Sequence, residues 1–422
     1  MQTWPLKRMD ELCEITSSKR IFAADYVSDG VPFYRGREIT EKYKGNLYVS
    51  TELFITEEKF REIERKFGAP EQGDLLLTSV GTLGSVYVVK PGDRFYFKDG
   101  NLTWFRHFKG LDSQFLYYWI GSPQGKAELQ KCTIGSSQSA FTIVLLKSME
   151  IELPPLPIQK HIAGILSAYD ELIENSQRRI RILEAMARAL YREWFVHFRF
   201  PGHENHPRVP SPLGEIPEGW EGTTLGAHLA ALESGKRPKG GIRDVNDGVP
   251  SIGAENINGI GEHDFAGEKF IPREFFQEMR KGVVCDRDVA IYKDGAYIGK
   301  SSYFRDGFPH SECCVNEHVF LLRADGVRLR QNALYLWLQE PDTVQTIRSK
   351  NANAAQPGIN QQTVRGLEVI LPDEKVAAHF DLLVDPLLAE IINLAKKTQN
   401  LRRTRDLLLP RLLSGQLELD VA

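Results

Sequence analysis

Apolar side chains recur every seven residues in two long segments of this chain. In residues 158–198 one such row includes Leu166, Ile173 and Ile180, and the pattern returns 218 positions later, near the C-terminal end. Heptads sustained over about 40 residues predict two helices on the order of 60 Å long that pack as a coiled coil. The side chains expected to form this helix-pair packing are Ile162, Leu166, Tyr169, Ile173, Ile180, Leu183, Leu190, Trp194, Phe380, Leu387, Ile391, Leu394, Leu401 and Leu408.

The second of these helices contains Asp385-Pro386 in its interior. Proline is tolerated in a first helical turn but kinks a helix interior, so we expect an interruption here, with Asp385 capping a fresh start. Because a whole lobe separates the two helices in the sequence, antiparallel packing is the natural arrangement. The arginines of their outer faces form either solvated surface or a docking surface for other subunits: Arg178, Arg179, Arg181, Arg402, Arg403 and Arg405.

The same offset of 218 positions relates the segments that precede the helices. The run Asp-Gly-Val-Pro at residues 29–32 recurs at 247–250, and Leu-Pro at 153–154 recurs at 371–372. Repeats of about 20–50 residues would indicate a solenoid or propeller. A period of this length indicates duplication of a whole domain, and hence internal pseudo-two-fold symmetry.

Within each lobe the pattern predicts a mixed α/β domain. Short β-branched and aromatic runs such as 86–89 and 102–105 predict strands, while 114–120 and 334–338 predict short amphipathic helices. The predicted fold class is α+β, with two similar mixed α/β domains separated by two long antiparallel coiled-coil helices. The expected layout is residues 1–155 for the first domain, 156–200 for the first spacer helix, 201–219 for a linker rich in Pro and Gly, 220–372 for the second domain, 373–415 for the second spacer helix and 416–422 for a C-terminal tail.

Composition is that of an ordinary globular protein, with 42% hydrophobic and 26% charged residues. No apolar run approaches the roughly 18–20 residues that span a bilayer. The N-terminal residues lack the pattern of a signal peptide. The five cysteines have no CxxC spacing, which favours reduced thiols. We therefore expect a cytoplasmic protein. A net charge of −3 argues mildly against nucleic-acid binding by general attraction. If DNA is bound, basic residues must be focused on one face, or a partner must supply phosphate contacts.

Two sequence features resemble chemical sites only weakly. The stretch at residues 295–301 resembles a phosphate-binding loop, but it has three residues between its glycines where the ATP-binding pattern needs four. It is better interpreted as a tight turn between strands, as is the stretch from Gly81 to Gly84. His310, Cys313 and Cys314 lie close together in the sequence without a fourth ligand at usable spacing, so no metal site is predicted. No catalytic residue is predicted either.

Polar loops at matching places in the two lobes are the remaining candidates. Arginine pairs with guanine, Asn and Gln pair with adenine edges, and Ser or Thr with either, while Lys and Arg also hold phosphates. For any one residue, an exposed loop or a local hydrogen bond is the alternative interpretation. The predicted DNA-binding residues are Lys19, Arg20, Tyr34, Arg35, Arg37, Thr82, Ser136, Ser137, Gln138, Lys236, Arg237, Lys239, Asn256, Tyr297, Lys300, Asn353 and Gln356.

The motifs as a set resemble the specificity subunit of type I restriction-modification systems. They are DGVPFYRG at 29–36, GDLLL at 73–77 with GTLG at 81–84, LPPLPIQ at 153–159, LYREWFVHF at 190–198 and RDLLLPRLLSG at 405–415. The last two are the most specific, and together the resemblance covers nearly the whole chain.

This resemblance implies two target recognition domains joined by two helices. It also implies binding of a bipartite sequence in double-stranded DNA while the chain holds two modification subunits, which methylate adenine, and restriction subunits, which cleave DNA. S-adenosylmethionine, ATP and Mg are expected on those partners, and no cofactor or catalytic residue on this chain.

Two other functions are compatible with parts of the sequence. A helical assembly scaffold could use duplicated lobes to bind proteins. A nucleotide-dependent enzyme would have to use the incomplete loop that ends at Gly299-Lys300-Ser301.

Overall fold

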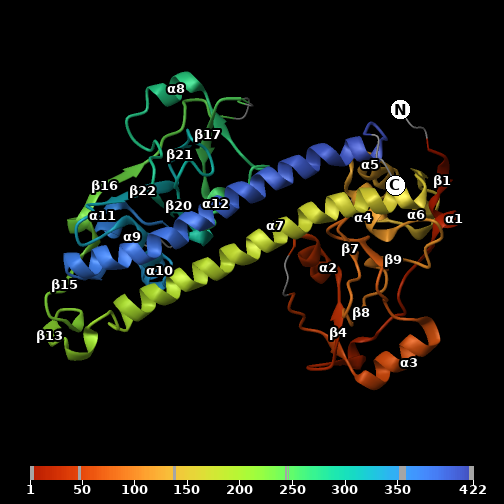
Figure 1. Cartoon of the computed structure of the whole chain (residues 1–422), viewed down its shortest axis with the longest axis horizontal. Coiled ribbons are helices and arrows are strands. Elements are labelled where there is room, and N and C mark those ends of the chain that lie inside the picture. Colours follow the sequence, from red (N-terminus) through yellow and green to blue (C-terminus); the bar gives the residue numbers. More distant parts are fainter. Residues whose placement is uncertain are drawn as a thin grey trace. The chain divides into compact units, whose positions relative to one another are not determined.

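The chain folds into two compact units, of which the first comprises Met1–Glu174 and Leu401–Ala422 and the second Asn175–Asn400. The computed structural model describes residues 4–45, 49–135, 139–242, 245, 247–350 and 358–417 (Figure 1). Two helices, α7 (Leu156–Tyr191) and α12 (Glu374–Leu413), contribute residues to both units. Each unit is therefore assembled from segments far apart in the sequence.

The first unit is a mixed α/β domain with two four-stranded sheets. Its elements before α7 are β1 (Leu6–Arg8), α1 (Met9–Leu12), β2 (Glu14–Thr16), η1 (Ala23–Asp25), β3 (Tyr26–Val27), β4 (Val31–Tyr34), α2 (Gly36–Tyr43), β5 (Phe54–Ile55), α3 (Glu57–Phe67), β6 (Leu75–Thr78), β7 (Val86–Val88), β8 (Tyr96–Phe97), β9 (Leu102–Arg106), α4 (Ser113–Gly121), α5 (Pro123–Lys131), β10 (Thr133–Ile134), β11 (Ala140–Phe141), α6 (Ile143–Lys147) and β12 (Glu150–Glu152). One sheet is antiparallel with the order β2-β9-β6-β7, and the other has the order β3-β5-β4-β8 with β4 parallel to β8. The pairs β1-β12 and β10-β11 complete the strand pairing.

The second unit has the same plan. Between α7 and α12 it contains η2 (Arg192–Val196), η3 (His203–Asn205), β13 (Arg208–Ser211), β14 (Gly214–Pro217), β15 (Glu221–Thr224), η4 (Leu225–His228), β16 (Leu229–Ser234), β17 (Val249–Ile252), η5 (Ala254–Asn256), β18 (Phe270–Ile271), α8 (Arg273–Gln277), β19 (Val289–Tyr292), η6 (Gly295–Tyr297), β20 (Ser301–Tyr303), β21 (Cys314–Val315), β22 (Val319–Ala324), α9 (Gln331–Leu338), α10 (Pro341–Ser349), α11 (Gln361–Arg365) and β23 (Glu368–Leu371). Its sheets have the orders β16-β22-β19-β20 and β18-β17-β21, and β17 is parallel to β21. The strand β15 pairs with β23, and β13 with β14.

Repeated local geometry explains why the two sequences share motifs. Gly30 and Gly248 precede β4 and β17 with φ values of +147° and +158°, and a Cβ at either would lie within 2.4 Å of the carbonyl oxygen of Ile55 or Ile271. Only glycine fits such a close approach of two strands. The predicted duplication of a mixed α/β domain is thus present as duplicated strand order.

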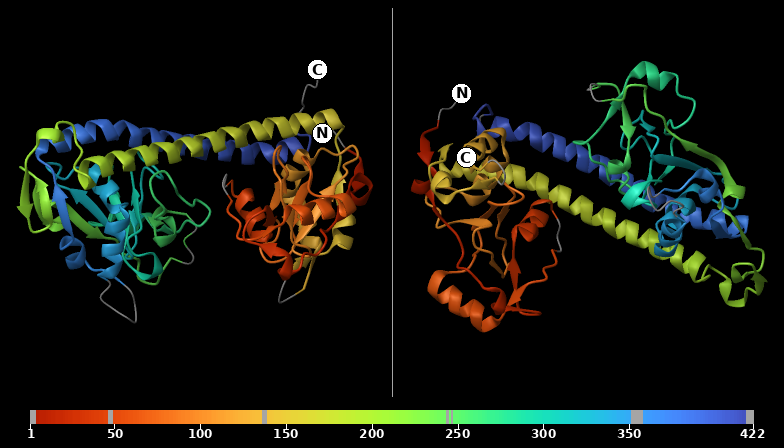
Figure 2. Two further views of the ribbon diagram at one scale, coloured as in Figure 1. Left: turned by 90° about the horizontal axis from the view of Figure 1, so that it is seen from below. Right: turned by 180° about the vertical axis from the view of Figure 1, so that it is seen from behind.

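Each unit closes its core on its own portions of α7 and α12. In the first unit Ile162 of α7 and Leu412 of α12 belong to the cluster that contains Phe115 of α4. In the second unit Trp194, just beyond α7, and Phe380 of α12 belong to the cluster that contains the strands of the larger sheet. Figure 2 shows that within each unit the strands lie on one side of its helix segments.

Helix contacts inside each unit are antiparallel, as the heptads and the chain order predicted. In the first unit Arg405 Nη1 lies 2.5 Å from Asp170 Oδ1, and the later residue Leu412 packs in the cluster with the earlier residue Leu166. In the second unit Arg179 pairs with Glu390 at 2.8 Å, and the rings of Trp194 and Phe380 are 5.6 Å apart.

The heptad side chains predicted for the helix pair all lie on buried or half-buried faces. Those that are buried are Ile162, Leu166, Ile173, Ile180, Trp194, Phe380, Ile391 and Leu394. The half-buried ones are Tyr169, Leu183, Leu190, Leu387, Leu401 and Leu408. Many of these side chains also face the strands and short helices of their unit. The heptad side chains therefore contribute to the domain core as well as to the contact between the two helices within that unit. Among the described helices, none is both long enough and apolar enough to cross a bilayer.

The interruption expected at Asp385-Pro386 is wrong, because α12 continues through it to Leu413. The Asp385 carboxylate accepts hydrogen bonds from Arg305 Nη1 and Nη2, both at 2.9 Å, and from Asn332 Nδ2 at 2.9 Å. Burial raises the pKa of Asp385, but these hydrogen bonds outweigh it and the pKa lies below its usual value. Tertiary contacts thus hold the helix on the second unit at the point where the proline removes a backbone donor.

Residues 201–219, predicted to be a linker, are largely structured. The hairpin β13-β14 pairs Val209 with Ile216, and Ile216 is buried in the core of the second unit. The ring of Phe200 lies 5.2 Å from that of Trp220. The Pro and Gly residues of this segment therefore form the turns of a packed element.

We predict that Asp385→Ala lowers the free energy of unfolding by about 3 kcal/mol, because Arg305 is only 5% exposed and would keep only the half-exposed Asp306 as compensation for its buried charge. Chemical denaturation of the full chain measures this difference. Leu382→Ala, on an exposed position of the same helix, should change stability by less than about 0.5 kcal/mol. Equal effects of the two substitutions would contradict the proposed role of the ion pair.

Candidate nucleic-acid interface

Three loop segments of the first unit border one groove of about 470 Å³. Arg35 and Arg37 line it from the start of α2, Thr82 from the turn between β6 and β7, and Lys44 and Asn101 from two further positions. We call this hollow the first-unit groove. Three of the predicted DNA-binding residues are thereby brought together.

A single buried carboxylate, Glu38, orients both arginines of this groove. Its Oε2 accepts the backbone N–H of Arg35 at 2.8 Å, and its Oε1 accepts Nη2 of Arg35 at 3.2 Å and Nη2 of Arg37 at 2.8 Å. Glu38 is 0% exposed, so the positive charges of the Arg35 and Arg37 guanidinium groups compensate the buried negative charge of its carboxylate. The arginine side chains are correspondingly fixed at the mouth of the groove.

The electrostatics favour the charged forms of Glu38 and Arg37. Burial raises the pKa of Glu38, but hydrogen bonds from the backbone and side chain of Arg35 and from Arg37 outweigh it, so the pKa is lowered. The hydrogen bond to Glu38 raises the pKa of Arg37. Half of the Arg37 side chain is exposed, and among the described residues the buried Nε of Arg35 has no hydrogen-bond partner. The exposed part of the Arg37 side chain is therefore the part that an external acceptor can reach.

The third predicted loop begins and ends close to this groove. Residues 136–138, with the predicted Ser136, Ser137 and Gln138, lie outside the described residues, but Ala140 forms a β-bridge with Val80, which lines the groove. The second unit repeats this arrangement, because Gly358 bridges to Asp294 just after β19. The predicted Asn353 and Gln356 also lie outside the described residues.

At the equivalent place in the second unit the side chains differ. The segment η5 follows β17 as α2 follows β4, and Glu255 there pairs with Lys269 at 2.5 Å. Asn256, predicted to contact DNA, is 3% exposed and donates its amide to the carbonyl of Asp264 at 3.1 Å. Asn256 is therefore a positioning residue of the loop, at the place that Glu38 takes in the first unit.

A chain of charged groups marks the neighbouring surface of the second unit. Arg237 pairs with Glu317 at 3.1 Å, Glu317 with His318 at 3.3 Å, and His318 with Asp294 at 2.7 Å. The structure thus brings the predicted Arg237 to the turn after β19. Lys236 and Lys239 are exposed on the same loop as Arg237.

The glycine-rich stretch at 295–301 forms the turn between β19 and β20, as predicted. Gly295 and Gly299 have φ values of 67° and 87°, which glycine adopts readily. Tyr297 is exposed, and the Nζ atom of Lys300 lies 4.5 Å from the centre of its ring. An exposed aromatic ring with a cation beside it offers stacking and charge to a ligand.

Three predicted residues lie elsewhere in the first unit, outside the lining of the groove. Lys19 Nζ sits 4.6 Å from the ring centre of Phe67, and Arg20 pairs with Asp99 at 3.0 Å. Tyr34 stacks on Phe95 with ring centres 4.4 Å apart, and burial raises its pKa. Lys19 and Arg20 are surface cations, whereas Tyr34 is part of the packing beneath α2.

The sequence did not reveal Glu38, Lys44 or Asn101 as members of the site. Glu38 lies three residues after Arg35 at the start of α2, but the familiar capping pattern begins with Ser or Thr. Because Arg35 stands where that pattern has Ser or Thr, the three-residue spacing to Glu38 alone does not identify Glu38 as part of the site. Lys44 and Asn101 become neighbours of Thr82 only through the fold.

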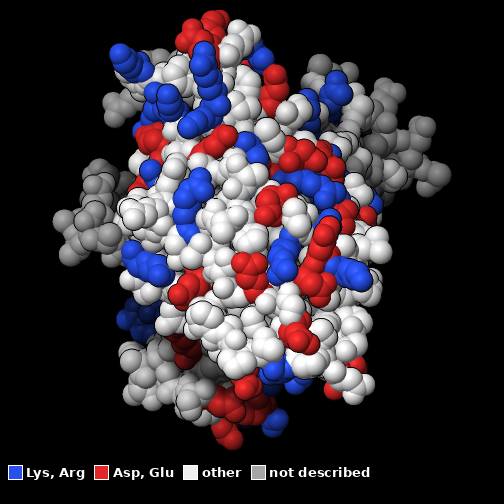
Figure 3. All heavy atoms as spheres, turned by 90° about the vertical axis from the view of Figure 1, so that its left-hand side faces the viewer, with Lys and Arg blue, Asp and Glu red and all other residues white. Residues whose placement is uncertain are grey.

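Charges of both signs are mixed over the face drawn in Figure 3, where Lys and Arg side chains alternate with Asp and Glu. This agrees with the net charge of −3. Binding to a polyanion on that face would require local arrangements of charge rather than a continuous basic field.

Comparison with known proteins gives one consistent result. Residues 1–185 match the family model of the type I restriction modification DNA specificity domain. The specificity subunit of type I restriction enzyme MjaIX of Methanocaldococcus jannaschii is 24% identical over 430 residues, covering 99% of this chain and 94% of the relative. The MjaVIII specificity subunit of the same organism is 25% identical over 281 residues, covering 65% of this chain and 64% of that subunit.

A solved structure shares the fold. The crystal structure of the type I restriction-modification system S subunit from M. genitalium matches with a TM-score of 0.59 at 17% identity, over 97% of this chain and 96% of that chain. The α+β fold class predicted from the repeat is confirmed by this match together with the duplicated strand order.

Residues 1–185 are therefore a DNA specificity domain, and the general function is recognition of a DNA sequence. The family predicted from the motifs is confirmed. Beyond residues 1–185 the similarity continues, because the MjaIX specificity subunit matches 99% of the chain.

We predict that Glu38→Gln destabilises the chain by about 1–3 kcal/mol at pH 7, because charge-assisted hydrogen bonds to a buried group are lost. The folded-state pKa of Glu38 lies below its usual value of 4.5. Its contribution is therefore present above pH 4.5 and is lost as the pH falls through the lowered pKa. Unfolding curves of both proteins between pH 3 and pH 7 should converge towards low pH.

The exposed Glu58→Gln is the control and should have little effect at either end of this range. A stability difference between wild type and Glu38→Gln that stays constant with pH would contradict the ionised state assigned to Glu38.

Proposed function

We propose that this chain recognises a bipartite DNA target, with residues 1–155 contacting one half-site and residues 220–372 contacting the other. In this proposal α7 and α12 fix the length of the unread gap between the half-sites. Polar loops of each domain enter the major groove, where base edges distinguish all four base pairs.

The observation that carries this proposal is a repeated framework with different loop side chains. The same strand order supports Arg35, Arg37 and Glu38 in one unit, and Gly253, Glu255 and Asn256 in the other. Duplication for stability alone would not require the loops at matching positions to differ in charge. Different donors and acceptors on one framework are expected if two domains recognise different sequences.

The helices also carry features suited to partner subunits. Ile182 and Met186 of α7 are each about half exposed, and residues four apart lie side by side on a helix. Exposed apolar neighbours of this kind favour protein contacts. They support the proposal that α7 and α12 hold two modification subunits, to which restriction subunits are added.

In the proposed complex the chemistry belongs to those partners. The modification subunits would methylate adenine with S-adenosylmethionine, and the restriction subunits would use ATP and Mg. An adenine rotated out of the stack would enter the partner's pocket. This chain would contribute position and sequence choice.

We predict that Arg37→Ala weakens binding to the target by at least about fivefold, because a bidentate contact to a base or a clamp on a phosphate is removed. The measurement is a titration of labelled DNA with the chain assembled with its modification subunits. Arg61→Ala, on the exposed side of α3, is the matched control and should bind as the wild type does. Unchanged affinity in both Arg37→Ala and Arg35→Ala would remove the first-unit groove from the DNA interface.

We predict that replacing residues 1–155 by the first domain of another specificity subunit changes one half of the methylated sequence and leaves the other half intact. Sequencing that detects methyladenine in the host genome measures both halves at once. Simultaneous change of both halves would argue against independent recognition. A complex that assembles but neither binds nor methylates DNA would favour a protein-binding scaffold.

A further inference from the structure

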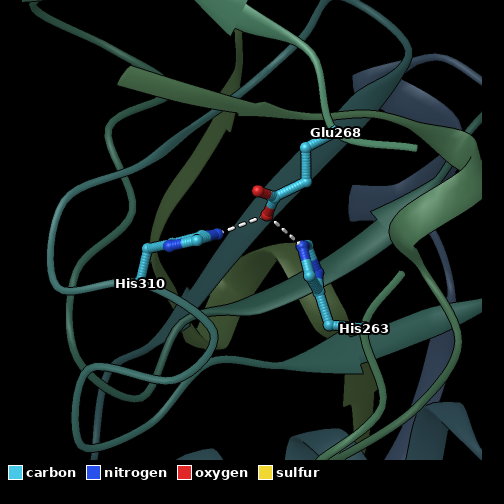
Figure 4. A group of neighbouring side chains, drawn as sticks. All are labelled: His263, Glu268 and His310. Atoms are coloured by element: carbon cyan, nitrogen blue, oxygen red, sulfur yellow. Dashed lines mark hydrogen bonds and ion pairs between the residues drawn. The ribbon is translucent and has the colours of Figure 1, made fainter. Parts of the chain in front are cut away.

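Two side chains of one loop and a third from a distant segment converge inside the second unit. His263 Nε2 lies 2.6 Å from Glu268 Oε1, and His310 Nε2 approaches the same oxygen. All three potential ligand atoms lie within 4.8 Å of one another. Figure 4 shows both imidazole rings directed at one carboxylate from different segments of the chain. We call these residues the His-Glu-His cluster.

The cluster is shielded from solvent. The side chains of His263, Glu268 and His310 are 1%, 11% and 25% exposed, and the ring of Phe265 packs 4.6 Å from that of His263. Among the described residues, Glu268 forms its ion pairs and hydrogen bonds only with the two histidines. A nearly buried carboxylate in such surroundings requires positive charge close by.

The shared fold does not demand this cluster. The segments that correspond to 253–269 and 304–313 in the first unit are 35–53 and 89–95, and neither contains a histidine. Those segments connect the same strands in the same order. The three side chains are therefore an addition of the second unit to a framework that forms without them.

We infer that the His-Glu-His cluster binds a divalent transition-metal ion of the zinc class. Two imidazole nitrogens and one carboxylate oxygen form a ligand set that Zn²⁺ takes in proteins, with water in the fourth position. The mixture of nitrogen and oxygen ligands disfavours Ca²⁺ and Mg²⁺, which prefer oxygen alone. The expectation of no metal site rested on His310 with Cys313 and Cys314, whereas the partners of His310 come from another loop.

The geometry needs little adjustment to admit the ion. Bonds of about 2.0–2.1 Å in a tetrahedral site separate ligand atoms by about 3.3 Å. Each nitrogen would therefore move away from Glu268 Oε1 by less than about 1 Å. The ion would replace the two imidazole protons that otherwise face the carboxylate.

Such an ion would join two loops that both hold α12. On the first loop, a Cβ added to Gly261 would lie 3.1 Å from Ile391 of α12, which shows how closely the loop packs. On the second loop, Arg305 binds Asp385 of α12. Cross-linking these loops would therefore stabilise the attachment of α12 to the strands of its own unit.

The test uses the tag-free full chain after treatment with a chelator, and Co²⁺ and Zn²⁺ as the added metals. We expect the wild type to take up one Co²⁺ per chain, with the absorption of a site built from nitrogen and oxygen ligands. Zn²⁺ at about 100 times its dissociation constant should raise the unfolding temperature by about 5–10 °C.

Glu268→Gln, which preserves size, and His310→Ala should each weaken Co²⁺ binding at least tenfold and abolish the temperature shift. His203→Ala removes another histidine that lies beside a carboxylate of the same unit, and it should leave both measurements unchanged. Circular dichroism of the metal-free proteins establishes that each variant is folded.

Equal Co²⁺ binding by wild type and folded Glu268→Gln would overturn the inference, and the cluster would then be a hydrogen-bonded triad only. A thiolate charge-transfer band would also overturn the proposed ligand set, because it would assign Cys313 or Cys314 to the metal. Neither outcome depends on DNA binding, so the inference fails or stands separately from the proposed function.

Discussion

Each unit closes its core with helix segments from distant parts of the sequence, and the remaining structure depends on this packing. In the first unit Leu412 joins the cluster of Ile162 and Leu166, and in the second Phe380 packs against Trp194. The small sheets expose an apolar face that these helices cover. Because the loops extend from strands fixed on that core, the position of each loop side chain follows from contacts between residues more than 200 positions apart, such as Arg179 with Glu390.

The elements predicted well from the sequence are those in which the spacing of residue types follows directly from which side chains are buried. The heptads of α7 and α12 mark the face that each helix turns to its core, since a helix exposes and buries side chains with a fixed period. The offset of 218 residues predicted the duplicated strand order for a similar reason, because turns such as those at Gly30 and Gly248 tolerate few other residues. The turn at residues 295–299 followed from its glycines.

The features that the sequence could not predict are those decided by tertiary contacts. Pro386 does not break α12, where Arg305 and Asn332 hold Asp385 from other elements. Asn256 has the side chain of a base-contacting residue, yet its burial is known only once Asp264 is placed beside it. For the candidate DNA site, the sequence indicated Arg35, Arg37 and Thr82, but the carboxylate that orients both arginines became visible only in the folded loop.

Because Arg35 and Arg37 share one buried carboxylate, a substitution at one of these positions changes the effect of a substitution at the other. Loss of either arginine leaves Glu38 with half of its compensation. Loss of Glu38 leaves Arg37 with the carbonyl of Ser50 and Arg35 with the more distant carboxylate of Glu52. Substitutions here are therefore epistatic, and gradual change one residue at a time must pass through poorly balanced intermediates. Inheritance of a whole lobe by recombination avoids such intermediates, because it transfers a mutually adapted set of loop residues in one event.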